Sequence, residues 1–212
     1  MNEPSATESE LRGPTKTSGS THESTGTVAL ALANTRATSR DPDRLASPAA
    51  AVDWMASAGL LPHDGPSRPA LPDARRLMDE CRRLRFAVLQ LLESLDRDQE
   101  DVSTEARTTI EKCVAAGVWV RSVEHSPHGL RIEESPVRTS DPRSLLAGIA
   151  VDAVSLVANA DPRRIRRCAA EDCLRWFLDT SRGSQRRWCS MATCGNRSKA
   201  TRHRARQPKA HL

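Results

Sequence analysis

The chain has 212 residues, with 32 Lys and Arg against 27 Asp and Glu, no Tyr and two Phe, so any core must consist mainly of Leu, Val, Ala and Trp. Its first 26 residues lack the basic start and apolar run of a secretory signal, and no apolar stretch approaches the ~20 residues of a membrane-spanning helix. These features argue against a secreted or membrane protein. We expect a cytoplasmic protein with reduced thiols, no membrane partner, and room for one ordinary domain and one small one.

Charge is unevenly distributed along the chain. Residues 163–209 contain 14 Lys and Arg but three acidic residues, a net charge of +11, which leaves −6 for the rest. A mildly acidic body with a strongly basic end favours a polyanionic partner, most often nucleic acid. The alternative is a basic tail that is merely solvated.

The first elements are read from caps and turn residues. Residues 1–26 are rich in Ser, Thr, Glu and Gly and predict a disordered tail. The next segment, Thr27–Thr35, is compatible with either a strand or a helix. A helix is predicted after Ser47, which can cap it, with Pro48 in its first turn and Gly59 as its stop. A Pro-rich link follows at 62–72.

The strongest predicted helix spans residues 73–98. Apolar residues recur there every three or four positions and form one stripe, which is typical of a helix packed on a core: Leu77, Cys81, Leu84, Val88, Leu91 and Leu95. Cys81 lies on this stripe, and Cys113 lies in a second helical segment. Neither has a partner at ligand spacing, so both are interpreted as small core residues.

A hairpin and another helix complete the body. "GVWVRSVEH" and "GLRIEES" flank a Ser-Pro-His-Gly turn and predict a short β-hairpin. The next helix has Asp141 as cap and Pro142 in its first turn, and Asp161-Pro162 ends it. Residues 27–160 are therefore predicted to form a mainly helical domain with a small sheet.

Four cysteines in the basic end form two pairs of the same C-x4-C spacing: Cys168, Cys173, Cys189 and Cys194. Zinc favours four thiolates supplied in two such pairs, and about forty residues cannot otherwise bury an adequate core. Disulfides or free thiols are the alternatives. Four thiolates would close the coordination shell, so one structural zinc is predicted rather than a catalytic one.

The architecture around this predicted metal is a hairpin followed by a helix. "LRWFLD" and "QRRWC" flank "TSRGS" and predict the two strands, and Ser190 is a plausible cap for the helix that carries Cys194. Trp176 and Trp188 are expected to pack beside the metal. The overall prediction is an α+β chain: a tail over 1–26, the helical domain over 27–160, a finger held together by zinc over 161–207, and a tail over 208–212.

At these residues the chain resembles a known family. "RRCAAEDCLRWFLDTSRGSQRRWCSMATCGNRSKATRHRAR" resembles the CGNR zinc finger, whose name is the tetrapeptide at 194–197. "LALANT", "SPAAAVDWMASAGLL" and the helix entering the finger resemble the ABATE-type domain that accompanies this finger in bacteria, although the acid of a family D-x-V/A-N element is missing before Asn34. The resemblance covers about residues 26–207. It implies the four cysteines as zinc ligands and a stress-linked role in transcriptional regulation.

Basic residues near the cysteines predict an interface for double-stranded DNA. Candidate contacts are Arg186, Arg187, Arg197, Lys199, Arg202, Arg204 and Arg206. At 100° per residue, Lys199, Arg202 and Arg206 share one stripe of the helix, while Arg197 and Arg204 lie on another. One stripe can line phosphates while the other approaches base edges. The helical domain would then form a homodimer, which suits paired half-sites, or sense a small-molecule effector.

Three other functions are alternatives to DNA binding. An RNA-binding module usually stacks bases on aromatic side chains, which are scarce here and needed for the core. A protein-interaction module would require an acidic partner. The six histidines are scattered, and none belongs to a recognisable catalytic motif, so no enzymatic activity is expected.

Overall fold

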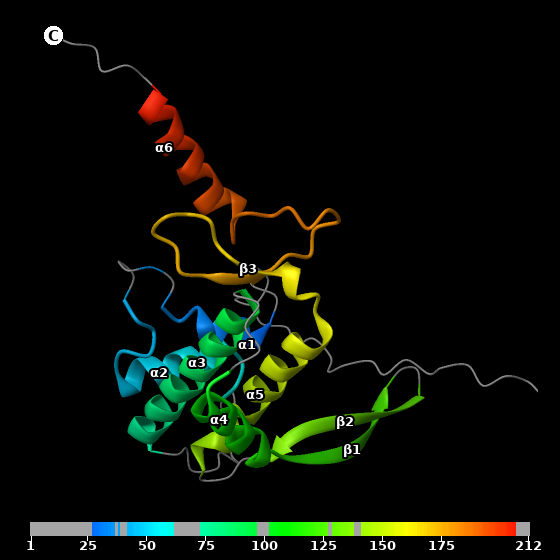
Figure 1. The fold of residues 1–212 in the computed structure, drawn as a ribbon. Helices are drawn as coiled ribbons and strands as arrows, with labels where there is room; N and C mark the ends of the chain where they lie inside the picture. The colour runs from blue at the N-terminus through cyan, green and yellow to red at the C-terminus, as the bar shows by residue number, and fades with distance from the viewer. Residues whose placement is uncertain are drawn as a thin grey trace, which may run out of the picture.

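The structure, a computed structural model, describes residues 27–36, 38, 42–61, 73–96, 102–126, 129–137 and 141–206. The two predicted tails and the Pro-rich link at 62–72 lie outside these ranges. In chain order the elements are α1 (Val28–Ala33), α2 (Pro48–Ser57), α3 (Ala74–Asp96), α4 (Thr104–Ala115), β1 (Val118–Ser126), β2 (Gly129–Val137), α5 (Pro142–Asn159), η1 (Pro162–Arg164), β3 (Ile165–Arg167), β4 (Trp176–Leu178), η2 (Met191–Gly195) and α6 (Asn196–Arg206). The α+β class is confirmed (Figure 1).

The predicted helix starts are confirmed by their caps. The Ser47 hydroxyl accepts a hydrogen bond from the Ala50 N–H at 3.2 Å, and Pro48 opens α2. Gly59 follows this helix with a φ of +71°, a left-handed conformation that favours glycine. The Asp141 carboxylate caps α5 by accepting from the Arg143 N–H at 2.9 Å. The ambiguous segment after Thr27 forms a helix, α1.

The core forms around α3, which contacts α1, α2, α4 and α5 (Figure 1). The predicted stripe is buried at Leu77, Cys81, Leu84 and Val88, but farther along the helix Leu92 is buried in place of Leu91. Cys113 on α4 is buried in the same core. Burial raises the pKa of both Cys81 and Cys113 to about 12, so these thiols stay protonated and act as apolar core residues, as predicted.

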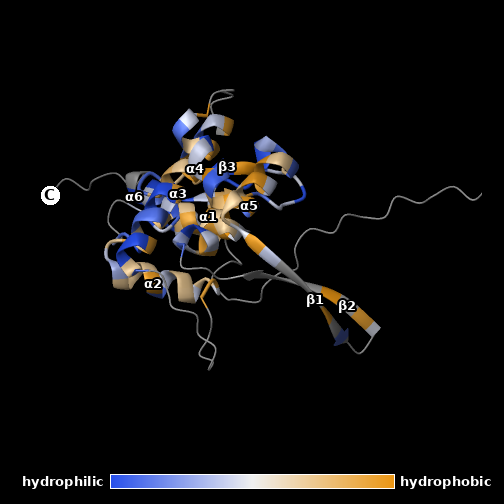
Figure 2. Ribbon diagram, turned by 90° about the horizontal axis from the view of Figure 1, so that it is seen from below, coloured by the Kyte–Doolittle hydropathy of each residue, from blue (hydrophilic) through white to orange (hydrophobic). Residues whose placement is uncertain are grey.

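The predicted hairpin is confirmed as an antiparallel ribbon of β1 and β2, in which Val118 pairs with Val137 and Ser126 with Gly129. The ribbon contacts α5 and extends away from the helices toward its turn (Figures 1 and 2). Near its base, the Trp119 indole lies beside Gly117 and Gly148, where an added Cβ would meet it at 3.2 and 3.9 Å.

The hairpin predicted within the finger is wrong in its pairing. β4 pairs antiparallel with β3, the segment before the first cysteine, rather than with "QRRWC". Residues 185–188 form no strand; they are joined to the finger by the hydrogen bond from the Ala169 N–H to the Arg187 carbonyl, at 2.8 Å. The loop closed by β3 and β4 therefore contains Cys168 and Cys173, so the strands position the first cysteine pair.

The position predicted for Trp176 beside the metal is also wrong. Trp176 and Phe177 are both buried, on opposite faces of β4. Trp176 packs with Ile165 in the core of the helical domain, whereas Phe177 packs among the four cysteines. Each face of β4 thus belongs to a different core, and the finger shares the core of the preceding helices.

Hydrogen bonds reinforce this junction. The Asn34 side chain donates to the Trp176 carbonyl and accepts from the Trp176 N–H, both at 2.8 Å, as a neighbouring strand would do. Thr38 forms an isolated β-bridge with Cys173. The segment after α1 therefore continues the β3–β4 sheet with side-chain and backbone partners.

Candidate zinc centre and basic helix

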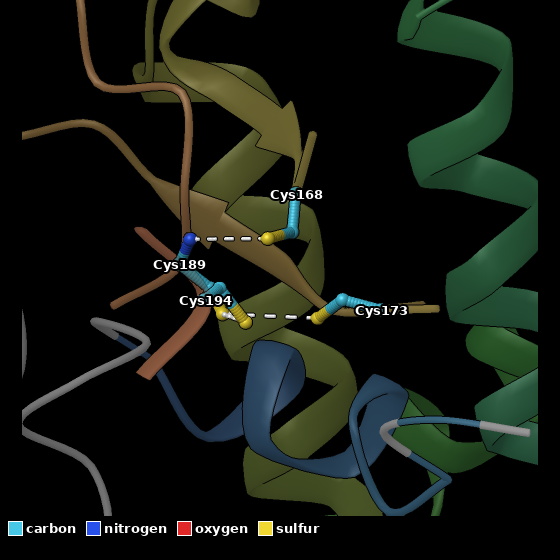
Figure 3. Close-up of side chains that lie close together, drawn as sticks. All are labelled: Cys168, Cys173, Cys189 and Cys194. Carbon is cyan, nitrogen blue, oxygen red and sulfur yellow. Dashed lines mark hydrogen bonds between the residues drawn. The ribbon is translucent and has the colours of Figure 1, made fainter. Parts of the chain in front are cut away.

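The four predicted ligand cysteines come together as one buried cluster, in which all four sulfurs lie within 4.8 Å of one another. Cys168 and Cys173 lie in the loop between β3 and β4, Cys189 follows the loop after β4, and Cys194 lies in η2. Their side chains point toward a common centre (Figure 3). All four are free cysteines, which agrees with a metal site rather than with disulfides.

The sulfur spacing fits a single tetrahedral zinc. Cys173 Sγ lies 3.8 Å from Cys189 Sγ, which lies 3.6 Å from Cys194 Sγ. Four thiolates at a Zn–S distance of ~2.3 Å lie about 3.8 Å apart at the corners of a tetrahedron. Zinc bound to these thiolates would hold the finger segments together and would leave no open position for water.

Contacts among the thiols of the cluster shift their pKa values in opposite directions. Donation from the Cys189 thiol lowers the pKa of Cys173 to about 5, against the opposing effect of burial. The same contact, together with burial, raises the pKa of Cys189, and burial raises that of Cys194. Without a metal, one thiolate is thus stabilised by its protonated neighbours. Zinc replaces those protons, so its binding is expected to release protons and to weaken as the pH falls.

Outer contacts hold the sulfurs in place. The Cys189 N–H donates to Cys168 Sγ at 3.4 Å, and an Arg197 N–H points at Cys194 Sγ at 3.8 Å. Arg197 also forms a 2.8 Å ion pair with Asp172, in the loop between the first two cysteines. Donors of this kind orient thiolate ligands and stabilise their charge. Arg197 therefore joins the two halves of the cluster.

Arg186 also points inward. Its guanidinium donates to the Trp188 carbonyl at 3.0 Å and to the Cys189 carbonyl, and it lies 5.0 Å from the centre of the Phe177 ring. These contacts hold the segment that leads into the second cysteine pair. Arg187 is exposed, with its guanidinium over the Trp188 ring at 5.5 Å, and Trp188 packs at the edge of the cysteine cluster as predicted.

Asp179 is a structural residue that the sequence analysis missed. Its buried carboxylate accepts from the Ser181 N–H at 2.9 Å, the Ser181 hydroxyl at 2.6 Å and the Arg186 N–H at 2.8 Å. Burial alone would raise the pKa of Asp179, but these hydrogen bonds lower it below its usual value. The signal in the sequence was an isolated acid followed by Ser181 in a basic segment, the pattern of an Asx turn.

The helix after the cluster begins as predicted. The Ser190 hydroxyl accepts from the Thr193 N–H at 3.3 Å, and the wide turn η2 then leads into α6 at Asn196. Gly195 lies at this junction, where an added Cβ would approach Met191 Sδ at 2.5 Å. A larger residue would therefore displace Met191, and regular helix begins at the next residue, Asn196.

The remaining predicted DNA contacts lie on α6. Lys199, Arg202 and Arg204 are exposed, and Arg206 is the last residue of the helix, with its side chain outside the described part. Arg202 donates to the Ser198 carbonyl at 3.4 Å, one turn back on the same helix. α6 packs on η2 and projects away from the helical domain (Figure 1).

Arg197 and Lys199 should respond differently to substitution. Arg197→Ala removes the contacts to Cys194 and Asp172, and we expect a loss of about tenfold in zinc affinity, the lower end of the effect of an outer-sphere contact. Lys199→Ala is the matched control on the same helix and should leave zinc affinity unchanged. Competition with a chromophoric chelator measures both. Equal zinc affinities in the two variants would contradict the role given to Arg197.

The fold and the site together define a class: a helical domain whose core is continuous with a small four-cysteine zinc finger. Comparison with known families agrees. Residues 164–207 match the CGNR zinc finger, and residues 26–160 match ABATE, described as a "putative stress-induced transcription regulator". The chain belongs to the ABATE family and contains a CGNR zinc finger. No curated protein matches it. Among the residues that the structure describes, no helix has the length and apolar character needed to cross a bilayer.

Proposed function

We propose that this protein is a transcriptional regulator that binds double-stranded DNA through α6. The main support for the proposal is the composition and position of α6. This 11-residue helix contains five Lys or Arg and no acidic residue, and it projects away from the helical domain, starting beside the four-cysteine cluster (Figure 1). Its side chains from Lys199 to Arg204 are exposed. Such a helix has no apolar face to bury and is ~16 Å long, which suits the major groove of DNA.

Arg186 and Arg197 make contacts inside the finger, so fewer residues are proposed to contact DNA than the sequence predicts. Because Arg186 and Arg197 hold the cluster, we assign them supporting roles, and we assign DNA contact to Arg187, Lys199, Arg202, Arg204 and Arg206. Lys199 and Arg202 lie three positions apart and share a face of the helix. They are suited to phosphates along one strand, while Arg204 on another face can approach base edges.

Salt dependence tests this proposal. We expect the affinity of the zinc-loaded protein for duplex DNA to fall steeply with salt, and Lys199→Ala or Arg202→Ala each to reduce the log–log slope by ~1. Fluorescence anisotropy of a labelled duplex measures this. Arg107→Ala is the control, since Arg107 is an exposed arginine on α4, which lies on the side of the body away from α6 (Figure 1).

Two outcomes would contradict binding of double-stranded DNA through α6. Tighter binding to single-stranded RNA than to the duplex would favour the RNA-binding alternative. Affinity for nucleic acid that is unaffected by salt or by the α6 variants would leave the finger as a protein-interaction module. The family description supports regulation of transcription, and a small-molecule effector stays a prediction.

A further inference from the structure

The β1–β2 ribbon carries an apolar face that the described part of the chain leaves exposed. Val123 and Leu130 are each 67% exposed and Ile132 is 69% exposed. Val123 pairs directly with Ile132, and Leu130 lies two residues before Ile132, so all three side chains share one face. Figure 2 shows apolar residues along this ribbon as it leaves the body. A two-stranded ribbon is at best marginally stable in water unless further strands or packing support it.

Within the described part of the chain β1 is the one strand that pairs with β2, and the hydrogen-bonding groups on the outer edge of β2 lie at defined positions. Ser126 and Gly129 flank a two-residue connection, so this pair exchanges hydrogen bonds and the pairs alternate from there. Leu130, Ile132 and Glu134 therefore belong to the pairs that do not bond within the ribbon, and their N–H and C=O groups point away from β1. Pro136 is also at a position that does not bond within the ribbon. The N–H that proline lacks would therefore have pointed to the outer edge, as expected for a proline in an edge strand.

We propose that this edge pairs with the β2 edge of a second copy of the chain, antiparallel and with the two-fold axis at Ile132. Ile132 then faces Ile132 of the second copy, and Leu130 faces Glu134 of the second copy on either side. All of these residues have outward N–H and C=O groups, so each pair can exchange two hydrogen bonds. The two ribbons become a four-stranded sheet that gathers Val123, Leu130 and Ile132 of both copies on one face, above the size at which a sheet is stable.

Pairs of charged residues and the position of Pro136 favour a two-fold axis at Ile132 over an axis at Glu134. With the axis at Ile132, Arg131 lies opposite Glu133 of the second copy, twice by symmetry. An axis at Glu134 would place two glutamates opposite each other and set Ile132 against Pro136, which has no N–H to donate. On the β1 edge, an axis at Arg121 would oppose two arginines, and an axis at Val123 would set Arg121 against His125 and Ser122 against Glu124, with no pair of opposite charge. The Ile132 register alone combines opposite charges with a complete set of donors.

Sedimentation velocity of the full zinc-loaded chain over a range of concentrations tests the proposal. We expect a monomer–dimer equilibrium in which Ile132→Lys raises the dissociation constant by about tenfold or more, because it places two ammonium groups at the axis. Phe86→Lys is the matched control, since Phe86 is 53% exposed on α3, and it should leave dimerisation unchanged. A wild-type chain that stays monomeric, or an Ile132→Lys dimer of unchanged affinity, would overturn the proposal.

A charge exchange identifies the register. Arg131→Glu alone should weaken the dimer, and Arg131→Glu with Glu133→Arg should restore it. Within one ribbon Arg131 pairs with Glu124, so Arg131→Glu sets two glutamates opposite each other, and Glu133→Arg then places an arginine diagonal to Glu124. Recovery of the dimer is therefore assigned to the second copy only where the single and double variants unfold at the same temperature as monomers. A dimer that is not restored, while zinc content and thermal unfolding match those of the wild type, would overturn this register. The sedimentation samples contain no DNA, so the measured dimerisation does not depend on whether α6 binds DNA.

Discussion

Chelation of zinc is expected to unfold the finger and to destabilise the helical domain as well. Binding of structural zinc supplies an apparent ~10–16 kcal/mol in small zinc modules. The finger has few other contacts that could supply this free energy. β3 and β4 share three residue pairs, and the apolar cluster around Phe177 consists largely of the four cysteines themselves. Loss of zinc should release β4, and with it Trp176 from the core of the helical domain.

Hydrogen exchange read by mass spectrometry can separate the two effects. After chelation, we expect protection to be lost in residues 165–195 and reduced in α1, whose C-terminal end is joined to β4 through Asn34. Re-addition of zinc should restore both. A finger that keeps its protection without zinc would contradict the structural role of the metal.

A cysteine outside the cluster supplies the control. Cys189→Ser should abolish stoichiometric zinc binding, because it removes one of four ligands. Cys81→Ala should keep zinc bound, although it leaves a small cavity in the core around α3. Elemental analysis of the two purified variants measures this difference.

Features that depend on neighbours in sequence were predictable. The caps Ser47, Asp141 and Ser190 accept hydrogen bonds from residues two or three positions ahead, so a short window contains all the necessary information. The four cysteines were identifiable because metal chemistry limits both the residue type and the spacing. The β1–β2 hairpin was identifiable because a Ser-Pro-His-Gly turn lies between two strand-like segments, although its register was not predicted.

The pairing of β4 was not predictable in this way. Alternation along "LRWFLD" assumes that a strand buries one face and exposes the other. β4 lies between two cores, so the adjacent residues Trp176 and Phe177 are both buried. Its side-chain partner Asn34 is 142 positions away in sequence, and no local pattern points to it.

The net charge of the finger likewise predicted a basic surface, but it did not predict which arginines stabilise the finger and which are exposed. Arg186 and Arg197 are part of the +11 balance, yet both are engaged with carbonyl, carboxylate or sulfur atoms of the finger. Their roles depend on where Trp188, Cys189 and Asp172 lie in space. A count of charges contains no such information.

The two buried aromatic residues of β4 should separate domain stability from zinc affinity. Trp176→Ala removes a large side chain from the core of the helical domain and is expected to lower the free energy of unfolding by about 3–5 kcal/mol. Phe177→Ala, its direct neighbour, should instead lower zinc affinity, because Phe177 excludes water from the cysteine cluster. Urea unfolding followed by far-ultraviolet circular dichroism and chelator competition give the two values for each variant.

Asn34 extends the same test to the backbone of β4. Asn34→Leu has a similar volume but leaves the Trp176 N–H and carbonyl without their buried partners, which should cost about 1–3 kcal/mol. Combined with Trp176→Ala, its effect should be less than additive, since both substitutions weaken the same junction. Strictly additive losses would mean that Asn34 and the Trp176 side chain stabilise independent parts of the fold, and that the finger does not share its stability with α1.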